Sequence, residues 1–301
     1  MHPDIIIRRG QHEDLDAIMD IWYANETRDE PEAPPRPQTL ADYPHLLSSG
    51  AIWIAERKGQ PIGFSGVVVR SNVAFLTDLF VHPQEHSGGL GGRLLHWAMD
   101  EYGDRARCTV SSTDLRALAL YTRYGMHPQW PNFLLRAQRL NLSRLPHSDM
   151  LLEPADPHDP ELIAWDARCS GRQRPEDHRY WQQSEGGIPY WLTLQGERRG
   201  YAYIRSNTLI LGDTGTAIQG VRIGPLGSLQ LNDTHAGLLA AIREAATHAD
   251  VIRVNLPGPN QSLASLLDAG FRISYVETFM LNAAQPIFDP SCYISSGSSL
   301  F

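Results

Sequence analysis

The sequence predicts an α/β protein with two similar domains, each a mixed, twisted sheet with helices on both faces, in three layers. Three observations support this fold class. The chain has 301 residues, enough for two domains of ordinary size. Stretches of β-branched and aromatic residues alternate with stretches of helical spacing, as in layered α/β proteins. The same order of elements also occurs twice.

The repeat is clearest in two hairpins. In each, a β-rich run is followed by a polar glycine turn and a second β-rich run. The first hairpin covers 53–72 and the second covers 191–207. Each half also opens with an amphipathic helix, expected over 15–23 and 162–168, and Tyr124-Gly125-Met126 matches Ala269-Gly270-Phe271. We interpret the pattern as a tandem duplication rather than a coincidence between two α/β domains.

Two proline- and serine-rich stretches suggest the domain limits. Residues 141–157 collect Ser, Pro, Asp and His without periodicity, which is typical of a linker. We therefore expect a first domain over 1–142 and a second over 150–284. The remaining segment, 285–301, is rich in Ser, Pro and Gly and is expected to be a tail, either mobile or lying across the surface.

Composition excludes several classes of function. A net charge of −8 and a pI near 5.8 argue against a broad nucleic-acid surface. Without a run of about 18 apolar residues, no membrane span is expected. Cys108, Cys169 and Cys292 form no CxxC pair, and the histidines at 82, 86 and 96 lack metal-ligand spacing, so we expect no metal site. The apolar run at the start is too short for the pattern of a signal peptide, so none is expected, and the sparse cysteines favour the cytoplasm.

A glycine-rich loop in the first half carries the clearest chemical signal. An apolar run over 75–81 predicts a buried strand, and helical spacing begins at Leu90. Between them lies His82-Pro83-Gln84-Glu85-His86-Ser87-Gly88-Gly89. Such a loop presents backbone N–H groups to an anion, and the dipole of the following helix favours negative charge. A phosphate-binding cradle is therefore expected.

This loop resembles the pyrophosphate loop of the GNAT acetyltransferases, (Gln/Arg)-x-x-Gly-x-Gly, which hold acetyl-coenzyme A. His86 stands where the family has Gln or Arg, and Ser87 where Gly is frequent. The resemblance also implies that the strand before the loop splays from its neighbour and binds the pantetheine arm with free backbone groups. The implied cofactor-binding residues here are Leu79, Phe80, Val81, His86, Ser87, Gly88, Gly89, Leu90, Gly91 and Gly92.

Asp78 is the candidate general base. Strand alternation places it on one face with Phe80, while Leu79 and Val81 point to the other face. An acceptor amine must lose a proton to attack a thioester, and a carboxylate can take it directly or through water. The alternative is a carboxylate that binds a loop amide or orients the substrate's ammonium group.

Tyr121 is the candidate general acid. A helix expected after Ser112-Thr113, either of which can cap it, ends at Gly125. On that helix Leu115, Leu118, Ala119 and Thr122 are expected to face the core. Asp114, Ala117, Tyr121 and Tyr124 form an adjacent stripe that matches the family's Asn-x-x-Ala-x-x-x-Tyr-x-x-x-Gly-Phe, with Asp114 for Asn and Met126 for Phe. The resemblance implies that this stripe contacts the cofactor and that Tyr121 protonates the departing thiolate; the alternative is an aromatic residue that only packs.

The second half lacks both the glycine-rich loop and a tyrosine at the position of the candidate acid. No Gly-x-Gly precedes its helix after 221–228, where Asn232, Asp233 or Thr234 is expected to be an ordinary cap. Leu266 stands where the first half has Tyr121. We therefore expect a degenerate GNAT-like domain with a structural role, and the aromatic residues Trp165, Tyr180, Trp181 and Tyr190 either line a cleft between the domains or belong to the core.

These expectations define an N-acetyltransferase. It would transfer acetyl from acetyl-coenzyme A to a primary amine of a small molecule by direct attack in a ternary complex. Acidic residues near Trp22 and Tyr23, namely Glu26, Asp29, Glu30 and Glu32, suit a cationic amine, although a solvated acidic loop is the alternative. Two other functions remain open, a non-catalytic acyl-coenzyme A-binding or regulatory protein and a protein or peptide N-acetyltransferase. A homodimer is the expected assembly.

Overall fold

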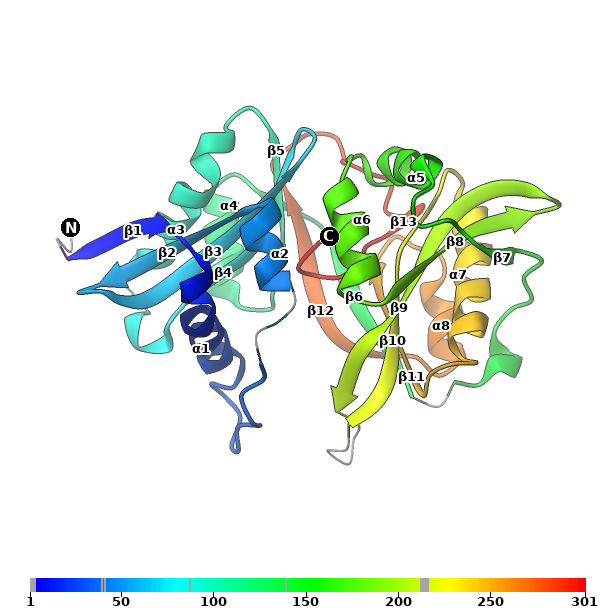
Figure 1. The fold of residues 1–301 in the computed structure, drawn as a ribbon, viewed down its shortest axis with the longest axis horizontal. Helices are drawn as coiled ribbons and strands as arrows, with labels where there is room; N and C mark the ends of the chain where they lie inside the picture. Colours follow the sequence, from blue (N-terminus) through cyan, green and yellow to red (C-terminus); the bar gives the residue numbers. More distant parts are fainter. Residues whose placement is uncertain (1–3, 39, 41, 87, 139, 212–216) are drawn as a thin grey trace. The chain divides into compact units, whose positions relative to one another are not determined.

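The computed structural model describes residues 4–301, apart from 39, 41, 87, 139 and 212–216. The chain divides into two compact units, Met1–Thr109 (unit 1) and Val110–Phe301 (unit 2). Both units combine sheet and helices, which confirms the predicted mixed α/β class (Figure 1). Each unit is described separately.

Unit 1 is built on a sheet with the strand order β1-β2-β3-β4-β5. The pairs are antiparallel except for β4 and β5, which run parallel. Helices α1 and α2 and, later in the chain, α3 pack on β2–β4. The elements are β1 (Ile5–Arg9), α1 (Leu15–Glu26), α2 (Asp42–Ser49), β2 (Ala51–Arg57), β3 (Gln60–Arg70), β4 (Val73–Val81), α3 (Leu90–Met99) and β5 (Ala106–Ser111), the last of which runs into unit 2.

Unit 2 has a larger sheet with the order β12-β6-β11-β10-β9-β8-β7, and β13 pairs with β10. Its helices are α4 (Leu115–Arg123), α5 (Pro160–Ser170), α6 (Pro175–Gln183), α7 (Leu231–Ala245) and α8 (Leu263–Asp268). Its strands are β6 (His127–Ala137), β7 (Leu151–Pro154), β8 (Gly187–Leu194), β9 (Glu197–Leu211), β10 (Ala217–Ser228), β11 (Val251–Pro257), β12 (Arg272–Leu281) and β13 (Tyr293–Ile294).

Both expected hairpins form, and their turns share the same backbone. Lys58 and Gly59 join β2 to β3 with φ of 53° and 76°, and Gln195 and Gly196 join β8 to β9 with 54° and 79°. Two positive φ angles in a two-residue turn match the right-handed twist of the flanking strands. A glycine at the second position of each turn therefore has the same cause in both halves, and supports the repeat.

Strand β6 shows why the compact units differ from the sequence repeat. It belongs to the first half of the sequence, yet it pairs antiparallel with β11 on one edge and β12 on the other. The first half therefore contributes its last strand to the sheet of unit 2. The limits 1–142 and 150–284 stay a prediction about the repeat, while the compact units divide between Thr109 and Val110.

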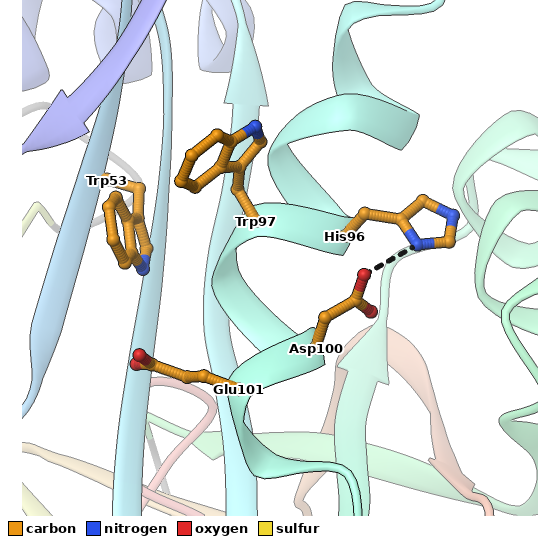
Figure 2. A pocket seen from close by; sticks show the side chains of 5 residues that line it. All are labelled: Trp53, His96, Trp97, Asp100 and Glu101. Atoms are coloured by element: carbon orange, nitrogen blue, oxygen red, sulfur yellow. Dashed lines mark hydrogen bonds and ion pairs between the residues drawn. The ribbon is translucent and has the colours of Figure 1, made fainter.

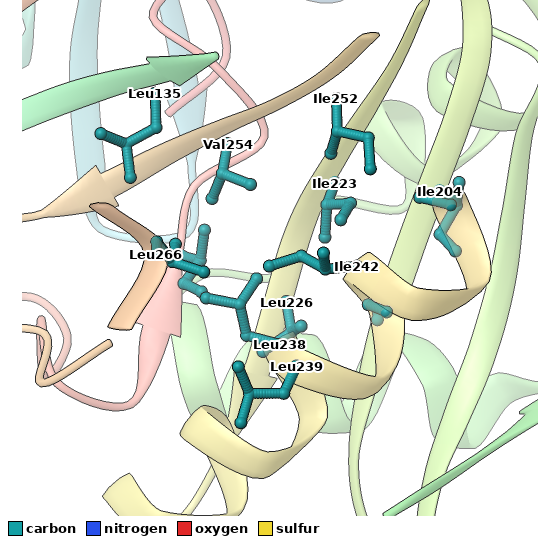
Figure 3. Close-up of a cluster of buried hydrophobic side chains, with 14 of the residues drawn as sticks. Leu135, Ile204, Ile223, Leu226, Leu238, Leu239, Ile242, Ile252, Val254 and Leu266 are labelled. Atoms are coloured by element: carbon teal, nitrogen blue, oxygen red, sulfur yellow. The ribbon is translucent and has the colours of Figure 1, made fainter. Parts of the chain in front are cut away.

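The core of unit 2 lies between α7 and strands β9–β11 (Figure 3). Leu238, Leu239 and Ile242 of α7 are fully buried against strand residues such as Ile223 and Val254. Tyr180, Trp181 and Tyr190 are also buried in unit 2, and Trp165 is half-buried. Their burial supports the interpretation that these aromatic residues belong to the core rather than line a cleft.

Two helix starts differ from the expectation. Asp114 itself caps α4, because its side chain accepts from the Arg116 N–H, so Ser112 and Thr113 lie outside the helix. Helix α7 begins at Leu231, and Gln230 at its N-cap makes no side-chain cap bond. Asn232, Asp233 and Thr234 therefore lie in the first turn rather than before it.

The prediction of which side of α4 faces the core was also wrong. Leu115 is 77% exposed, Ala119 and Thr122 are exposed, and Leu118 is half-buried. Tyr121 is the buried residue of this helix. Apolar spacing shows that a helix has a face but not which neighbour covers it, and here the tyrosine side is the covered one.

The 285–301 segment is neither mobile nor laid across the surface. Tyr293, Ile294 and Phe301 are at most 1% exposed. Phe301 stacks on Phe279 of β12 with ring centroids 4.8 Å apart. Aromatic residues within a Ser- and Gly-rich stretch anchor it in the core, which composition alone did not reveal.

Candidate active site

The β4–α3 connection has the backbone expected of an anion cradle. A short 3-10 turn, Pro83–Glu85, follows β4, and Gly89 at the N-cap of α3 has a φ of 73°. This left-handed conformation suits glycine. Helix α3 begins at Leu90 as predicted, and Leu90, Leu94, Leu95 and Ala98 are buried. Its first-turn N–H groups and positive dipole end therefore lie directly after the glycines.

His86 makes a contact that the sequence did not suggest. Its Nε2 lies 2.9 Å from the Val81 carbonyl oxygen, and Arg28 Nη1 approaches Nδ1 at 3.5 Å. The Val81 oxygen also accepts from the Asn25 side chain at 3.1 Å. His86 thus ties the loop back to the end of β4, and its contact with a pyrophosphate stays a prediction. Ser87 lies outside the described residues.

Strand β4 separates from β5 partway along its length. The parallel ladder joins Val73–Leu76 to Ala106–Thr109 and then ends. Within the described part of the chain, residues 77–81 have no strand partner on that side. Leu79, Phe80 and Val81 therefore lie on a splayed strand, as the cofactor prediction requires.

The two faces of β4 are those expected from alternation. Leu79 and Val81 pack with Leu90 and Leu94 of α3. Phe80 stacks on Phe64, with centroids 5.5 Å apart, on the opposite face. A bulge at Thr77 interrupts the pairing with β3, so that Asp78 pairs with Gly66 and Leu76 with Val67. Asp78 shares the Phe80 face.

Asp78 sits in an environment that suits a base. Tyr43 Oη donates to Asp78 Oδ1 at 3.3 Å, while Oδ2 is buried without a hydrogen-bond partner in the described structure. Burial, and then the charge of Asp42, raises the pKa of Asp78 to about 7, although hydrogen bonding opposes the shift. Burial also raises the pKa of Tyr43, so this phenol stays a donor. A carboxyl with this pKa can accept a proton near neutral pH.

Of the acidic residues near Trp22 and Tyr23, Glu26 acts on the Asp78 carboxyl, together with Asp42 of α2. The charges of Asp42 and Glu26 both raise the pKa of Asp78. Asp29, Glu30 and Glu32 are exposed, which agrees with a solvated loop for these three. Tyr43 and Asp42, both on α2, were missed because α2 itself was not predicted from the sequence.

Gly66 offers a test of how the bulge positions Asp78. A Cβ at Gly66 would overlap Thr77 Oγ1 and lie 3.3 Å from Asp78 Oδ2. We expect Gly66→Ala to displace the bulge and to lower kcat/KM by about 10–100-fold, because misplaced catalytic groups lose rate steeply. Steady-state kinetics measure this effect. Gly103→Ala is the matched control, since the atom nearest to its Cβ would be the Asp100 carbonyl oxygen, 3.8 Å away. Equal activity of the two variants would contradict the positioning role.

Tyr121 lies on α4 in unit 2 and is 6% exposed. Ala117 and Tyr124, which share its stripe, are half-buried. Asp114 is engaged at the helix start, where its carboxylate binds the Arg116 N–H at 2.8 Å and the Arg116 guanidinium at 2.6 Å. The cofactor contacts of Asp114, Ala117 and Tyr124, and the acid role of Tyr121, stay predictions.

The second half lacks both the glycine-rich loop and the tyrosine of the first half, as predicted. Eight residues, 82–89, separate β4 from α3, whereas only Leu229 and Gln230 separate β10 from α7. Leu266, at the position of Tyr121, is fully buried on α8. A two-residue connection cannot form a phosphate-enclosing loop, and leucine cannot donate a proton.

A surface pocket of about 340 Å³ lies at the other end of α3 (Figure 2). Trp53 and Trp97 line it, with ring centroids 5.6 Å apart. His96, Asp100 and Glu101 complete its wall. The two carboxylates and the negative end of the helix dipole make it unsuitable for a pyrophosphate, and the Gly89 end of α3 stays the predicted anion site.

Two further features of the described residues bear on the site. No group of three His, Cys, Asp or Glu side chains that could hold a metal ion occurs there. None of the helices formed by the described residues has the length and apolarity needed to cross a membrane.

Comparison with known proteins finds a family match in the first half of the chain. Residues 15–126 match the family model of the acetyltransferase (GNAT) family. A search of curated protein sequences finds no significant match.

Solved structures show the same fold over nearly the whole chain. A Pyrococcus horikoshii protein, provisionally described as an acetyltransferase, matches with a TM-score of 0.75 and 13% identity, covering 100% of this chain and 97% of that one. A tandem GNAT protein from the clavulanic acid biosynthesis pathway matches at 0.58 and 15%, covering 94% and 99%. A GCN5-related N-acetyltransferase from Sphaerobacter thermophilus matches at 0.58 and 14%, covering 96% and 98%. At these identities the likeness establishes the fold.

Proposed function

We propose that this chain acetylates a primary amine of a small molecule, because residues 15–126 match the acetyltransferase (GNAT) family model and the chain has a fold similar to that of a tandem GNAT protein. Acetyl-coenzyme A is the donor, and the amine attacks directly within a ternary complex. The observation that carries the proposal is Asp78, a half-buried residue on the splayed strand β4 whose Oδ2 is buried and whose pKa is about 7.

The proposed reaction uses three groups of this chain. The acceptor ammonium loses a proton to Asp78, directly or through a water molecule, and the free amine attacks the thioester carbonyl. Backbone N–H groups of β4 hold the carbonyl oxygen as it becomes negative. The C–N bond forms, the C–S bond breaks, and Tyr121 donates its phenolic proton to the departing thiolate. The attacking nitrogen then releases its second proton through water to the Tyr121 phenolate, and Asp78 returns its proton to solvent. The products are the N-acetylated amine and coenzyme A.

The charges around Asp78 favour a cationic acceptor. Asp42 and Glu26 are close enough to raise its pKa, so a positive group near them would be attracted electrostatically. Tyr43 and Phe64, whose rings meet edge to face at 5.7 Å, add aromatic surface beside the carboxyl. We therefore propose a small amine that is protonated in solution.

A second candidate function is a non-catalytic acyl-coenzyme A-binding protein. It is favoured by His86, which is held toward the Val81 carbonyl, and by Asp114, which is engaged by Arg116. Release of free thiol from acetyl-coenzyme A, measured over a panel of small amines and peptides, separates the functions. Turnover on small amines supports the proposal, turnover confined to peptides supports a protein acetyltransferase, and binding with no turnover on any acceptor supports the binding protein.

The setting of the reaction is also part of the proposal. We place it in the cytoplasm, where the three buried cysteines would stay reduced thiols. We take a homodimer as the assembly, which light scattering after size-exclusion chromatography measures directly.

The glycine loop gives a prediction on cofactor binding. Gly91 lies in the first turn of α3, where a negative side chain stabilises a helix but repels a pyrophosphate. We expect Gly91→Asp to raise the Kd for coenzyme A at least tenfold without lowering Tm. Isothermal titration calorimetry measures the Kd, and Gly91→Asn is the neutral control of equal size. If the two variants bind coenzyme A equally well, the pyrophosphate does not sit at this helix start.

A further inference from the structure

The splayed strand of the first half has a counterpart in the second half. Strands β10 and β11 form a parallel ladder that joins Gly220–Ile223 to Val251–Val254. It is as long as the ladder of β4 with β5, which joins Val73–Leu76 to Ala106–Thr109. Beyond the ladder, the edge of β10 would be open to a pantetheine arm, as the edge of β4 is.

In the second half this edge is occupied. Leu226 and Gly227 of β10 pair antiparallel with Ile294 and Tyr293 of β13. Strand β13 also contacts β11, so it lies within the fork of the two strands. It supplies a peptide backbone where the first half leaves β4 unpaired (Figure 1, red).

The helix start of the second half is occupied as well. The Cys292 carbonyl oxygen accepts from the Ser228 N–H at 3.1 Å and from Thr234 Oγ1 at 3.1 Å, at the beginning of α7. A ligand oxygen bound at the N-terminal end of a helix meets similar donors. The segment therefore brings its own oxygen acceptor to this position.

Buried charges hold the segment in place. Arg174, the N-cap residue of α6, makes two hydrogen bonds of 2.7 Å to Asp166 on α5. It also donates to Tyr293 Oη at 2.5 Å and to the Phe301 carbonyl at 3.0 Å. Arg174 and Asp166 are at most 1% exposed. Releasing the segment would leave this buried pair without two of its partners, which costs free energy.

Residues of β11 and β12 also hold the segment. Asn255 Nδ2 donates to Ser298 Oγ at 3.4 Å, and Ser298 Oγ donates to Glu277 Oε2 at 2.9 Å. Gly224 on β10 also has no room for a side chain, because a Cβ there would overlap the Ser295 carbonyl oxygen. The groove and the segment are thus closely fitted to each other.

We propose that the 285–301 segment is a built-in occupant of the groove in which the second half would otherwise bind acyl-coenzyme A. This rests on the proposed function, because that function supplies the ligand of the first half. The chain therefore takes up one coenzyme A, in its first half, and the segment completes the fold of the second half in place of a cofactor.

Binding stoichiometry tests the proposal. Titration of the full chain with coenzyme A is expected to give one site per chain, and Gly91→Asp is expected to weaken it at least tenfold. Two sites, or a site that Gly91→Asp leaves unchanged, would overturn the inference while leaving acetyl transfer intact. If coenzyme A does not bind at all, the proposed function fails, and the segment is judged by the measurements that follow.

Hydrogen exchange and one pair of variants test the segment itself. The amides of 292–296 are expected to be as protected as those of β10, and saturating coenzyme A is expected to leave their exchange unchanged. Ile294→Ala, which empties a fully buried site, is expected to lower Tm by roughly 5–10 °C. Ile188→Ala, at a residue 51% exposed on β8, is the control and is expected to change Tm little. Rapid exchange of 292–296, exchange that coenzyme A accelerates, or equal Tm values for the two variants would contradict a permanent occupant.

Discussion

Asp78→Asn is expected to lower kcat/KM by about 10²–10⁴-fold, the range typical of a lost general base. The asparagine side chain keeps the size of Asp78 and can still accept from Tyr43, but it cannot take a proton from the acceptor amine. The Kd for coenzyme A is expected to stay unchanged. Steady-state kinetics and calorimetry on the same preparation measure both quantities.

The pH profile separates a base from a merely structural carboxylate. With a pKa of about 7, Asp78 becomes a competent base as the pH rises through 7, so kcat/KM of the wild type is expected to rise over pH 6–8. Asp78→Asn is expected to lose this rise. A variant that keeps the wild-type profile at lower rate would assign the base to another group.

As the pH rises, the contribution of Asp78 to the free energy of unfolding is expected to fall while the activity rises. Because folding raises the pKa of Asp78, the folded state binds the proton more tightly, and the destabilising contribution grows as the pH rises from about 4 to about 7. Asp78→Asn removes the buried charge, so its Tm is expected to exceed that of the wild type at pH 8 but not at pH 4. A lower Tm at pH 8 would instead mean that the charge is stabilised in the folded protein.

Local sequence signals predicted the parts of the site whose geometry is local. Gly89 and Leu90 marked the start of α3, because a left-handed glycine and the onset of helical spacing are encoded in adjacent residues. Alternation along β4 placed Asp78 and Phe80 on one face even though a bulge at Thr77 interrupts the pairing. The bulge lies at 77, before this pair, so the alternation between 78 and 81 survives.

Tertiary contacts determined the parts that were missed. Tyr43 lies on α2, a helix of eight residues that contains Pro44, and its short pattern did not indicate that it would face Asp78. The pairing partners of β6 are equally invisible in its own sequence. The 285–301 segment has the composition of a loose tail, but a few aromatic residues and the partners of Arg174 keep it buried.

Tyr121→Phe is expected to lower kcat and kcat/KM alike, by about 10²-fold, because a general acid acts in the transition state and contributes little to ground-state binding. The change removes one hydroxyl oxygen from a ring that is 6% exposed, so the packing of α4 should persist. Thiol release under saturating acetyl-coenzyme A measures kcat. The Kd for coenzyme A and the Tm are expected to stay near the wild-type values.

Tyr124→Phe is the matched control, since it removes the same atom one turn further along the chain, after the last residue of α4. We expect it to keep most of the activity. If both variants lose activity equally, the hydroxyl groups act through the cofactor's position rather than through proton donation. If Tyr121→Phe instead lowers Tm and leaves kcat unchanged, Tyr121 only packs, and the thiolate must leave unprotonated or take its proton from water. Because Leu266 shows that the same position tolerates an apolar side chain in the second half, a loss of rate without a loss of stability would assign the hydroxyl to chemistry.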